Sequence, residues 1–431
     1  MFLVLSGVTV LLTAVFSAVN FKAGHMRAGN VSLLVTIFLS AVFFLLRDST
    51  VFVYSAAIFS VTAAAAVFVF RYPPEKHGTG SDGNTRFDER DISFSRFKLI
   101  PGTDNYIDYY QRNPGKENTD ARTRAFPGLL SKDSRYYHRL NFAAADASFH
   151  LLQHLKGAVD GPVADSVPVE DSRFLTDYIR RLMKLYGVKC YGITTVKPAH
   201  YYSHTGRAAG GYGREIQAEH SYAIVLCSEM KPGFTSTAPL SPEVIETGLR
   251  YAESGVWAVQ TAAFIRNLGY SARAHIDGDY LVVAPLIALD AGVGGFGWSS
   301  VFLTRKYGPR VRFSVVTTNM ELQVSEVKPS TDFLSFCRVC RKCAVNCPSR
   351  AINPDRLEKL NADRCFMYWN SVGTDCGKCL AVCPMGHPWG LLKTLALRYR
   401  LAGWLLKWLD DVFYGKKPPA KPLPKWMVKV K

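Results

Sequence analysis

Two cysteine-rich runs decide how this chain is interpreted: CRVCRKCAVNCP at residues 337–348 and CFMYWNSVGTDCGKCLAVCP at residues 365–384. Together they hold eight of the ten cysteines. In the first run three cysteines follow one another with two residues between them, and a fourth stands directly before proline. Such spacing wraps three thiolates around one corner of an iron–sulfur cube, and the cysteine before proline reaches the neighbouring cluster. The pattern predicts two [4Fe–4S] clusters.

The crossed pattern divides the eight cysteines into two ligand sets. The first set is predicted to be Cys337, Cys340, Cys343 and Cys383, and the second Cys347, Cys365, Cys376 and Cys379. The second run is less regular, because ten residues rather than two separate its first two cysteines. Structural zinc or disulfides are the alternatives, although zinc requires no crossed fourth cysteine. The other two cysteines, Cys190 and Cys227, stand in strand-like apolar runs and are predicted to be ordinary buried residues.

The composition bounds the class of protein. A chain of 431 residues is long enough for two or three domains with a large core. Its net charge of +17 indicates a nucleic acid, a membrane surface or an anionic cofactor as partner. Apart from a basic tail, the lysines and arginines do not form blocks, which favours a membrane or an anionic cofactor and predicts no nucleic-acid partner. Clustered thiolates indicate assembly in a reducing compartment.

The N-terminal region reads as a membrane anchor. Residues 1–19, 31–46 and 51–70 contain no charged side chain. Because a helix rises ~1.5 Å per residue and the hydrocarbon core is ~30 Å thick, the first and third runs can span and the second is marginal. Neither a basic stretch nor a twin arginine marks a secretory signal. We therefore expect three transmembrane helices within residues 1–72; a buried helical hairpin of a soluble core is the alternative.

Flanking charges predict the orientation of this anchor. Lys22 and Arg27 follow the first span, and Arg71 and Lys76 follow the third, whereas the opposite side has only Arg47, offset by Asp48. Positive residues favour the cytoplasmic side. We expect an integral protein of the inner membrane whose large domain lies in the cytoplasm.

Four further regions follow the anchor. Residues 73–130 are predicted to be extended with short helices, 131–330 to form an α/β domain, 331–395 to form a ferredoxin-like domain with both clusters, and 396–431 to form a basic, amphipathic tail. The α/β prediction rests on alternating signals. Its strand candidates are 221–227, 280–285 and 311–317, and its helix candidates are 173–186 and 249–267. The helix expected at 390–414 either packs on the domain or lies on the bilayer.

A glycine-rich stretch follows an apolar run at residues 291–297, AGVGGFG. Glycines let a backbone approach a large flat or phosphate-bearing ligand closely. The spacing does not match the dinucleotide motif, so a nicotinamide cofactor is not expected. The candidate cofactor-binding residues are Gly292, Gly294, Gly295 and Gly297.

Several of these segments together resemble the reductive dehalogenases. The resemblance begins at Asp88-Glu89-Arg90-Asp91 with Phe94 and Arg96, and continues through Pro101-Gly102, Tyr109-Tyr110 and Pro114. It includes AAFIRNLGY at 262–270, APLIALDAGVGGFG at 284–297 and LTRKYGPRVR at 303–312, and ends with the paired cysteine motifs. It covers roughly residues 85–395, and the motifs are specific only in combination. Epoxyqueuosine reductases share the same core.

The resemblance implies a nitroreductase-like α/β domain that binds a corrinoid (a cobamide, or B12-type cofactor) in the base-off mode, with cobalt reduced by the clusters. It assigns proton donation to Tyr251 and a basic partner role to Arg310, with Lys306 and Arg312 as alternative cations. Asp277 is assigned to the cofactor site, although many members have asparagine there. Because the base-off mode uses no histidine ligand, His204, His220 and His275 receive no role.

The sequence thus predicts a membrane-anchored oxidoreductase that replaces a carbon-bound halogen by hydrogen. Its partners would be an organohalide, the lipid membrane, and an electron donor that is reduced ferredoxin, flavodoxin or linked to a quinol. The anchor departs from respiratory members of the family, which resemble exported proteins with a separate small anchor. Two alternatives stay open: an epoxyqueuosine reductase acting on tRNA, and a non-catalytic iron–sulfur electron-transfer subunit of the membrane.

Overall fold

The computed structural model describes residues 2–23, 25–46, 49, 72, 85–165, 171–207, 211–325 and 332–428. The predicted third span at 51–70 lies outside the described residues, as do Arg47, Asp48, Arg71 and Lys76 of the charge argument.

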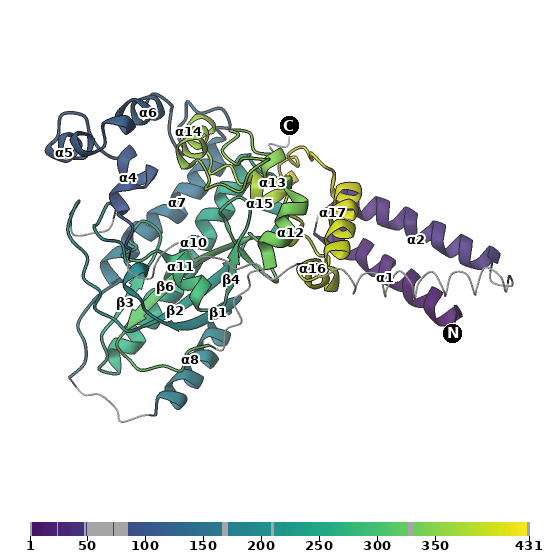
Figure 1. Cartoon of the computed structure of the whole chain (residues 1–431), viewed down its shortest axis with the longest axis horizontal. Coiled ribbons are helices and arrows are strands. Elements are labelled where there is room, and N and C mark those ends of the chain that lie inside the picture. The colour runs from purple at the N-terminus through teal and green to yellow at the C-terminus, as the bar shows by residue number, and fades with distance from the viewer. Residues whose placement is uncertain are drawn as a thin grey trace.

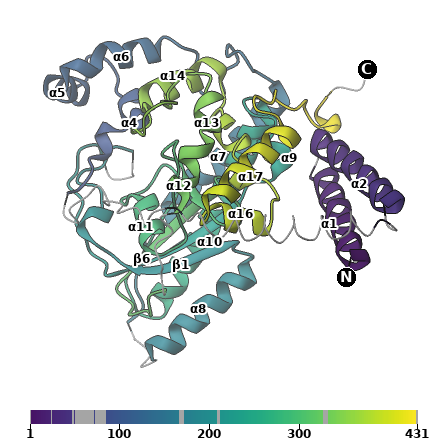
Figure 2. The same cartoon turned by 45° about the vertical axis from the view of Figure 1, so that its right-hand side comes forward.

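The N-terminus is a hairpin of two helices, α1 (Phe2–Lys22) and α2 (Met26–Leu46), which projects from the body (Figures 1 and 2). Hydroxyls fasten the pair: Ser17 Oγ donates to the Gly29 carbonyl and Ser32 Oγ to that of Thr13, each at 2.9 Å. Within the described part, one helix is long and apolar enough to span a membrane, over Met26–Leu45, and 17% of that window is buried.

For the two predicted runs that the structure describes, this result changes which one can span. The run predicted to be marginal is the qualifying one, because its helix begins at Met26, five residues before the charge-free stretch. The first run contributes only a shorter apolar segment, Thr9–Lys22.

A four-stranded antiparallel sheet in the order β1-β2-β6-β3 forms the centre of the body. Its strands are β1 (Cys190–Thr195), β2 (Tyr222–Glu229), β3 (Ala272–His275) and β6 (Val311–Thr318); β4 (Gly294–Phe296) and β5 (Phe302–Thr304) form a separate hairpin. The strands predicted at 221–227 and 311–317 are confirmed. The strand predicted at 280–285 is wrong: proline at the first turn starts helix α11 (Ala284–Asp290) there, and only Val282 forms an isolated bridge.

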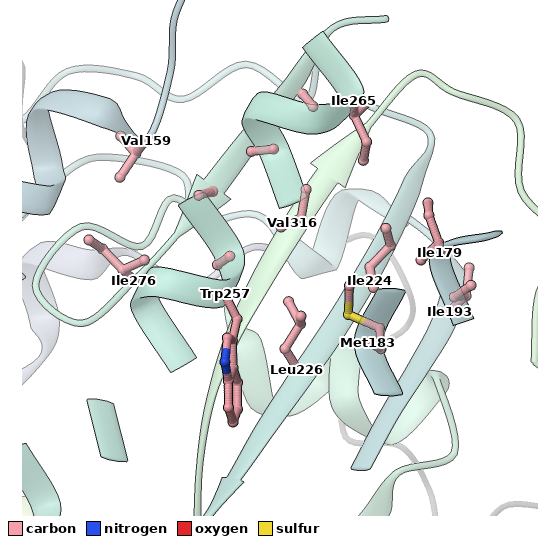
Figure 3. Close-up of a cluster of buried hydrophobic side chains, with 14 of the residues drawn as sticks. Val159, Ile179, Met183, Ile193, Ile224, Leu226, Trp257, Ile265, Ile276 and Val316 are labelled. Atoms are coloured by element: carbon pink, nitrogen blue, oxygen red, sulfur yellow. The ribbon is translucent and has the colours of Figure 1, made fainter. Parts of the chain in front are cut away.

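Helices cover both faces of the sheet, which explains the continuous apolar run in β2. Ile224 and Leu226 point to one face, and Val225 and Cys227 to the other. The first face is covered by α8 (Ser172–Tyr186) and the long α10 (Ser241–Asn267), whose Ile179, Met183, Trp257 and Ile265 surround it in Figure 3. Helix α11 covers the second face.

Both helix predictions in this region hold: 173–186 is α8, and 249–267 lies within α10, which begins eight residues earlier. Helix α7 (Arg139–Leu155) packs along α10. Residues 85–130 form short helices, as predicted. These are η1 (Glu89–Asp91), α4 (Ser93–Phe97), α5 (Asp104–Arg112) and α6 (Pro114–Arg124). Three short turns of helix complete the domain: η2 (Lys156–Ala158), η3 (Pro198–His200) and α9 (Pro232–Thr235).

The C-terminal third consists of helices and turns, and its described residues 332–428 include no strand. The elements are α12 (Asp332–Cys340), α13 (Lys342–Val345), α14 (Ala362–Val372), α15 (Lys378–Ala381), η4 (Pro384–Gly386), α16 (Leu391–Ala396), α17 (Arg400–Tyr414) and η5 (Lys425–Met427). Helix α17 lies at the base of the α1–α2 hairpin (Figures 1 and 2) and contacts α2. A buried hydrogen bond also joins α17 to α1: Tyr414 Oη donates to Asn20 Oδ1.

Candidate active site

The two cysteine runs fold as near repeats of one another. In each, a left-handed residue, Arg341 (φ 50°) or Gly377 (φ 62°), starts a short helix that carries the next cysteine of its run. The two short helices, α13 and α15, contact each other. This packing brings the two runs together, so that a cysteine of one run can reach the thiols of the other.

The thiols of the two runs lie close enough to influence one another. Burial raises the pKa of the Cys340 thiol, and Cys383 and Cys337 raise it further. Burial likewise raises the pKa of Cys379, with contributions from Cys365, Cys376 and Cys347. The two sets adjoin, since Cys379 also acts on Cys343. All ten cysteines are free, so no disulfide joins them.

The chemistry of these thiols fits a metal cluster. Burial raises the pKa of Cys337 to about 11 and that of Cys383 to about 12, whereas a coordinated thiol is deprotonated outright. Among the described residues no three Cys, His, Asp or Glu side chains converge on one metal-ion position. A cube does not require such convergence, because each thiolate binds a different iron.

Tyr251 lies on the sheet-facing side of α10, where it meets the arginine of β6. The guanidinium carbon of Arg312 stands 5.3 Å from the centroid of the Tyr251 ring. Burial raises the pKa of Tyr251 to about 12, and Arg312 partly opposes this rise. The phenol is therefore protonated at neutral pH and has a cation beside it that stabilises a phenolate.

Arg312 connects this tyrosine to the second cysteine set. Its Nη2 donates to Thr247 Oγ1 at 3.0 Å and to Asp375 Oδ2 at 3.3 Å, and Thr247 Oγ1 donates to the same carboxylate oxygen at 2.7 Å. Asp375 directly precedes Cys376 in the chain. Arg312 Nε is buried and has no hydrogen-bond partner among the described residues.

Arg310, the predicted cationic partner of Tyr251, instead binds groups in a different part of the fold. It pairs with Glu229 at 3.2 Å, donates from Nε to the Gly386 carbonyl at 3.0 Å, and also donates to the Met230 carbonyl. The reason is local. Strand β6 begins at Val311, so its alternation directs Arg312 toward α10, while Arg310 belongs to the preceding turn. The other alternative, Lys306, lies over the Tyr307 ring at 5.1 Å.

Asp277 lies in the turn after β3, near the same tyrosine. It raises the pKa of Tyr251, and Arg207 lowers it. Tyr280, which is buried, is close to both Tyr251 and Asp277, and its hydroxyl donates to the Phe313 carbonyl at 2.7 Å. The predicted pair Tyr251 and Asp277 thus lies in one polar group with two residues that the sequence did not single out, Arg207 and Tyr280.

Two further residues near the site, Glu243 and Thr247, could have been found from their spacing in the sequence. Glu243, Thr247 and Tyr251 follow one another at four-residue spacing and therefore share one face of α10. Glu243 is fully buried, and its pKa is raised by burial and by neighbouring Asp375. This face could have been noticed as a polar stripe on a helix that is otherwise buried. Arg207 lies in a loop far away in sequence, without such a signal.

The glycines of the 291–297 stretch are placed against the chain itself. A Cβ added to Gly294 would lie 1.9 Å from the Leu303 carbonyl oxygen, and one added to Gly297 would lie 2.3 Å from Leu303 Cδ1. Gly292 has a left-handed φ of 69°. Close packing of β4 on β5 thus accounts for two of the four glycines, and Gly295 lies next to Gly294 in β4. A Cβ added to Gly297 would also lie 3.6 Å from Cys337 Sγ, so the stretch runs beside this cysteine.

The three histidines have protein partners. His220 and His275 both contact Thr317 Oγ1, at 2.8 and 2.9 Å, and His204 lies 3.5 Å from Asp88. Burial lowers the pKa of His275. Their ring nitrogens therefore serve hydrogen bonds within the fold.

Known proteins share both sequence and fold with this chain. A tetrachloroethene reductive dehalogenase of Sulfurospirillum multivorans is 33% identical over 214 residues, which cover 45% of this chain and 42% of that protein. One of Desulfitobacterium hafniense is 33% identical over 165 residues, covering 33% of this chain and 29% of that protein. The chain is thus similar to reductive dehalogenases over part of its length. An epoxyqueuosine reductase of Francisella cf. novicida is also related, with 27% identity over 146 residues, or 30% of this chain and 39% of that protein.

Solved structures share the fold. A reductive dehalogenase described with a mechanism for B12-dependent dehalogenation has a TM-score of 0.58 and 23% identity, over 70% of this chain and 46% of that chain. A catabolic reductive dehalogenase in complex with 3-bromo-4-hydroxybenzoic acid has a TM-score of 0.62 and 20% identity, over 81% of this chain and 49% of that chain. No family model matches the chain. The matched regions span less than half the length of these curated relatives.

Proposed function

We propose that this protein is a membrane-anchored reductive dehalogenase that catalyses R–X + 2e⁻ + H⁺ → R–H + X⁻. The observation that carries the proposal is the contact of Tyr251 with Arg312, which in turn donates a hydrogen bond to Asp375, the residue before Cys376. A protonated phenol, a cation and two sets of buried thiols provide the proton and the electron path that this reaction needs.

The cofactors proposed are two [4Fe–4S] clusters and a base-off corrinoid. Cys337, Cys340, Cys343 and Cys383 would hold one cluster, and Cys347, Cys365, Cys376 and Cys379 the other. Asp277 and the stretch containing Gly292, Gly294, Gly295 and Gly297 would border the corrinoid. When bound, the corrinoid supplies low-potential cobalt that engages the halogen. Two observations support the fit: the glycine stretch runs beside Cys337, and the buried Arg312 Nε has no partner in the described part.

The chain's own residues would manage the proton. Tyr251 would donate its phenolic proton to the carbon that loses halide, which is general acid catalysis worth about 10² to 10⁴ in rate. Arg312 would stabilise the phenolate that remains. Thr247 and Asp375 hold the guanidinium in place by the hydrogen bonds described above. Burial of the group keeps water from protonating the wrong centre.

The domains proposed are an anchor at 1–72, an extended segment at 73–130, a corrinoid-binding domain at 131–330, a two-cluster domain at 331–395 and a basic tail at 396–431. Helix α2 supports the anchor, and α17 supports contact with the bilayer surface, because Trp408 on its outer face is 61% exposed. The large domain would lie on the cytoplasmic side of the inner membrane.

Halide release tests this activity directly. The anaerobically purified chain, reconstituted with clusters and corrinoid and supplied with a low-potential reductant, should release chloride or bromide from some member of a panel of chlorinated ethenes and bromophenols. The similarity to an epoxyqueuosine reductase favours one alternative function, reduction of epoxyqueuosine in tRNA. Conversion of epoxyqueuosine in tRNA without any halide release would overturn the proposal in favour of that enzyme.

A further inference from the structure

A cavity opens directly onto the first cysteine set, away from Tyr251. It has a volume of about 730 Å³ and lies between α12, α13 and α17. Cys340 forms part of its wall, together with Arg338, Arg341, Arg400, Lys407 and Lys416. Tyr251 is linked instead to the second set, through Arg312 and Asp375. A redox partner in this cavity would therefore meet a cluster ligand without approaching the substrate.

The wall of the cavity is strongly positive. It contains six lysine and arginine side chains and one carboxylate, Asp411. That carboxylate already contacts Lys407 at 3.0 Å and the buried Lys342 at 3.4 Å, and Lys342 also pairs with Asp410. Arg400 and Lys416 are exposed at the rim. Focused positive potential of this kind attracts an anionic partner and speeds its association.

The rim also offers an apolar contact. Trp404, half exposed on the outer face of α17, lines the same cavity. An aromatic anchor within a charged rim is typical of transient protein interfaces. Six cationic side chains against one carboxylate give the wall a net positive charge, which favours an acidic protein over a neutral, lipid-soluble carrier.

We propose that this cavity is the docking site of an acidic electron-carrier protein of the ferredoxin or flavodoxin class. The proposal rests on the proposed function, since it requires a cluster at Cys340. In each encounter the reduced carrier loses one electron and the cluster gains one. No bond forms or breaks, and no proton moves. Two encounters deliver the two electrons that one dehalogenation consumes.

The test follows cluster reduction alone, without organohalide. The full chain with reconstituted clusters, in nanodiscs, is mixed anaerobically with reduced flavodoxin, and bleaching of the cluster absorbance is recorded. The variant Arg400→Glu/Lys416→Glu changes the rim. The control Arg181→Glu/Lys184→Glu makes the same change in charge on α8, which is well separated from α17 in Figure 1.

At low salt the rim variant should be reduced at least about tenfold more slowly than the wild type, and the control within about twofold. Raising the salt should slow the wild type and largely remove the difference. Equal rates in rim variant and control would overturn the proposal. The proposal would also be overturned if the rim variant were reduced more slowly by a short-chain quinol but not by flavodoxin.

Dithionite should bleach wild type, rim variant and control to the same extent, which shows that each still holds its clusters. Iron and sulfide analysis separates the two levels of failure. A wild-type chain without clusters would overturn the proposed function as well, whereas a chain with clusters but no carrier dependence on the rim would overturn the docking site alone.

Discussion

At the scale of single residues, the identity of the arginine beside Tyr251 depends on where one strand begins. Arg310 and Arg312 are two residues apart, and in an extended strand they would point the same way. Because β6 starts at Val311, only Arg312 follows the alternation and faces α10. The sequence could narrow the partner of Tyr251 to a few cations but could not choose between them. The choice depends on the contacts of Arg310 with Glu229, Met230 and Gly386, which are distant in sequence.

Tyr251→Phe tests the proton donor. Removing one hydroxyl leaves the packing of α10 intact, so clusters and corrinoid should bind as before, while turnover falls by about 10² to 10⁴. Steady-state halide release and the cluster spectrum measure the two effects. In the wild type, a pKa of about 12 keeps the phenol protonated, so its ionisation should not reduce activity between pH 7 and 10. Unchanged turnover in the variant would remove Tyr251 from the mechanism.

Arg312→Gln and Arg310→Gln should fail in different ways. The first removes the cation next to the phenol, so turnover per folded molecule should fall at least about tenfold; the loss of its bonds to Thr247 and Asp375 should also lower stability. The second removes hydrogen bonds to a carboxylate and two carbonyls, so it should lower the free energy of unfolding by about 2 kcal/mol. Chemical denaturation and turnover per folded molecule distinguish them. The reverse pattern would restore Arg310 as the partner.

At the scale of elements, the cysteine runs were the most readable part of the chain. Their spacing predicts how the eight thiols divide between two clusters, because short spacings fix which thiols face one corner. Helix 173–186 was equally readable, since its apolar face repeats with helical periodicity. The apolar run 280–285 misled, because a short run alone does not distinguish a strand from the start of a helix. Arg207 joins the site through a loop and had no local signal.

Paired cysteine substitutions test the crossed ligand sets. Cys343→Ser with Cys383→Ser changes two members of one proposed set, so roughly half of the iron should remain with an intact cluster spectrum. Cys343→Ser with Cys347→Ser changes both sets and should disturb both clusters. Iron content and EPR of the reduced protein report the difference. The opposite result would show that each run holds its own cluster.

Gly377→Ala tests the repeat that brings the runs together. The added Cβ would occupy a left-handed backbone and lie 2.3 Å from Glu243 Oε1, which is buried. We expect a loss of about 2 kcal/mol or more in the free energy of unfolding. Gly115→Ala, in α6 with nothing within 4 Å of the new Cβ, is the matched control and should be neutral or slightly stabilising. Equal stability of the two variants would contradict this explanation.

At the scale of the whole molecule, the α1–α2 hairpin, the cysteine region and the sheet domain form a series. The α1–α2 hairpin meets α17, α17 borders the cavity at Cys340, and the second cysteine set leads to Arg312 and Tyr251. Sequence hydropathy indicated a membrane region, but the number and limits of the helices depended on where each begins. The path from the α1–α2 hairpin to the tyrosine involves residues more than two hundred positions apart and could not be derived from local patterns.

A reporter fused after Lys431 tests the topology. Positive charges near the predicted spans favour a cytoplasmic body. A fusion to green fluorescent protein, which fluoresces in the cytoplasm, should be bright, and a fusion to alkaline phosphatase, which requires export, should be inactive. An active phosphatase fusion would place the body on the other side of the membrane.

The most direct test of the whole account is the cobalt content of the anoxically purified, cofactor-reconstituted protein, measured together with iron and with EPR. The account predicts about one corrinoid and about eight iron atoms per chain, with a cobalt(II) signal of the base-off type that disappears as the clusters are reduced. Iron and sulfide at that level with no bound corrinoid would contradict it, and would leave an electron carrier in place of a dehalogenase.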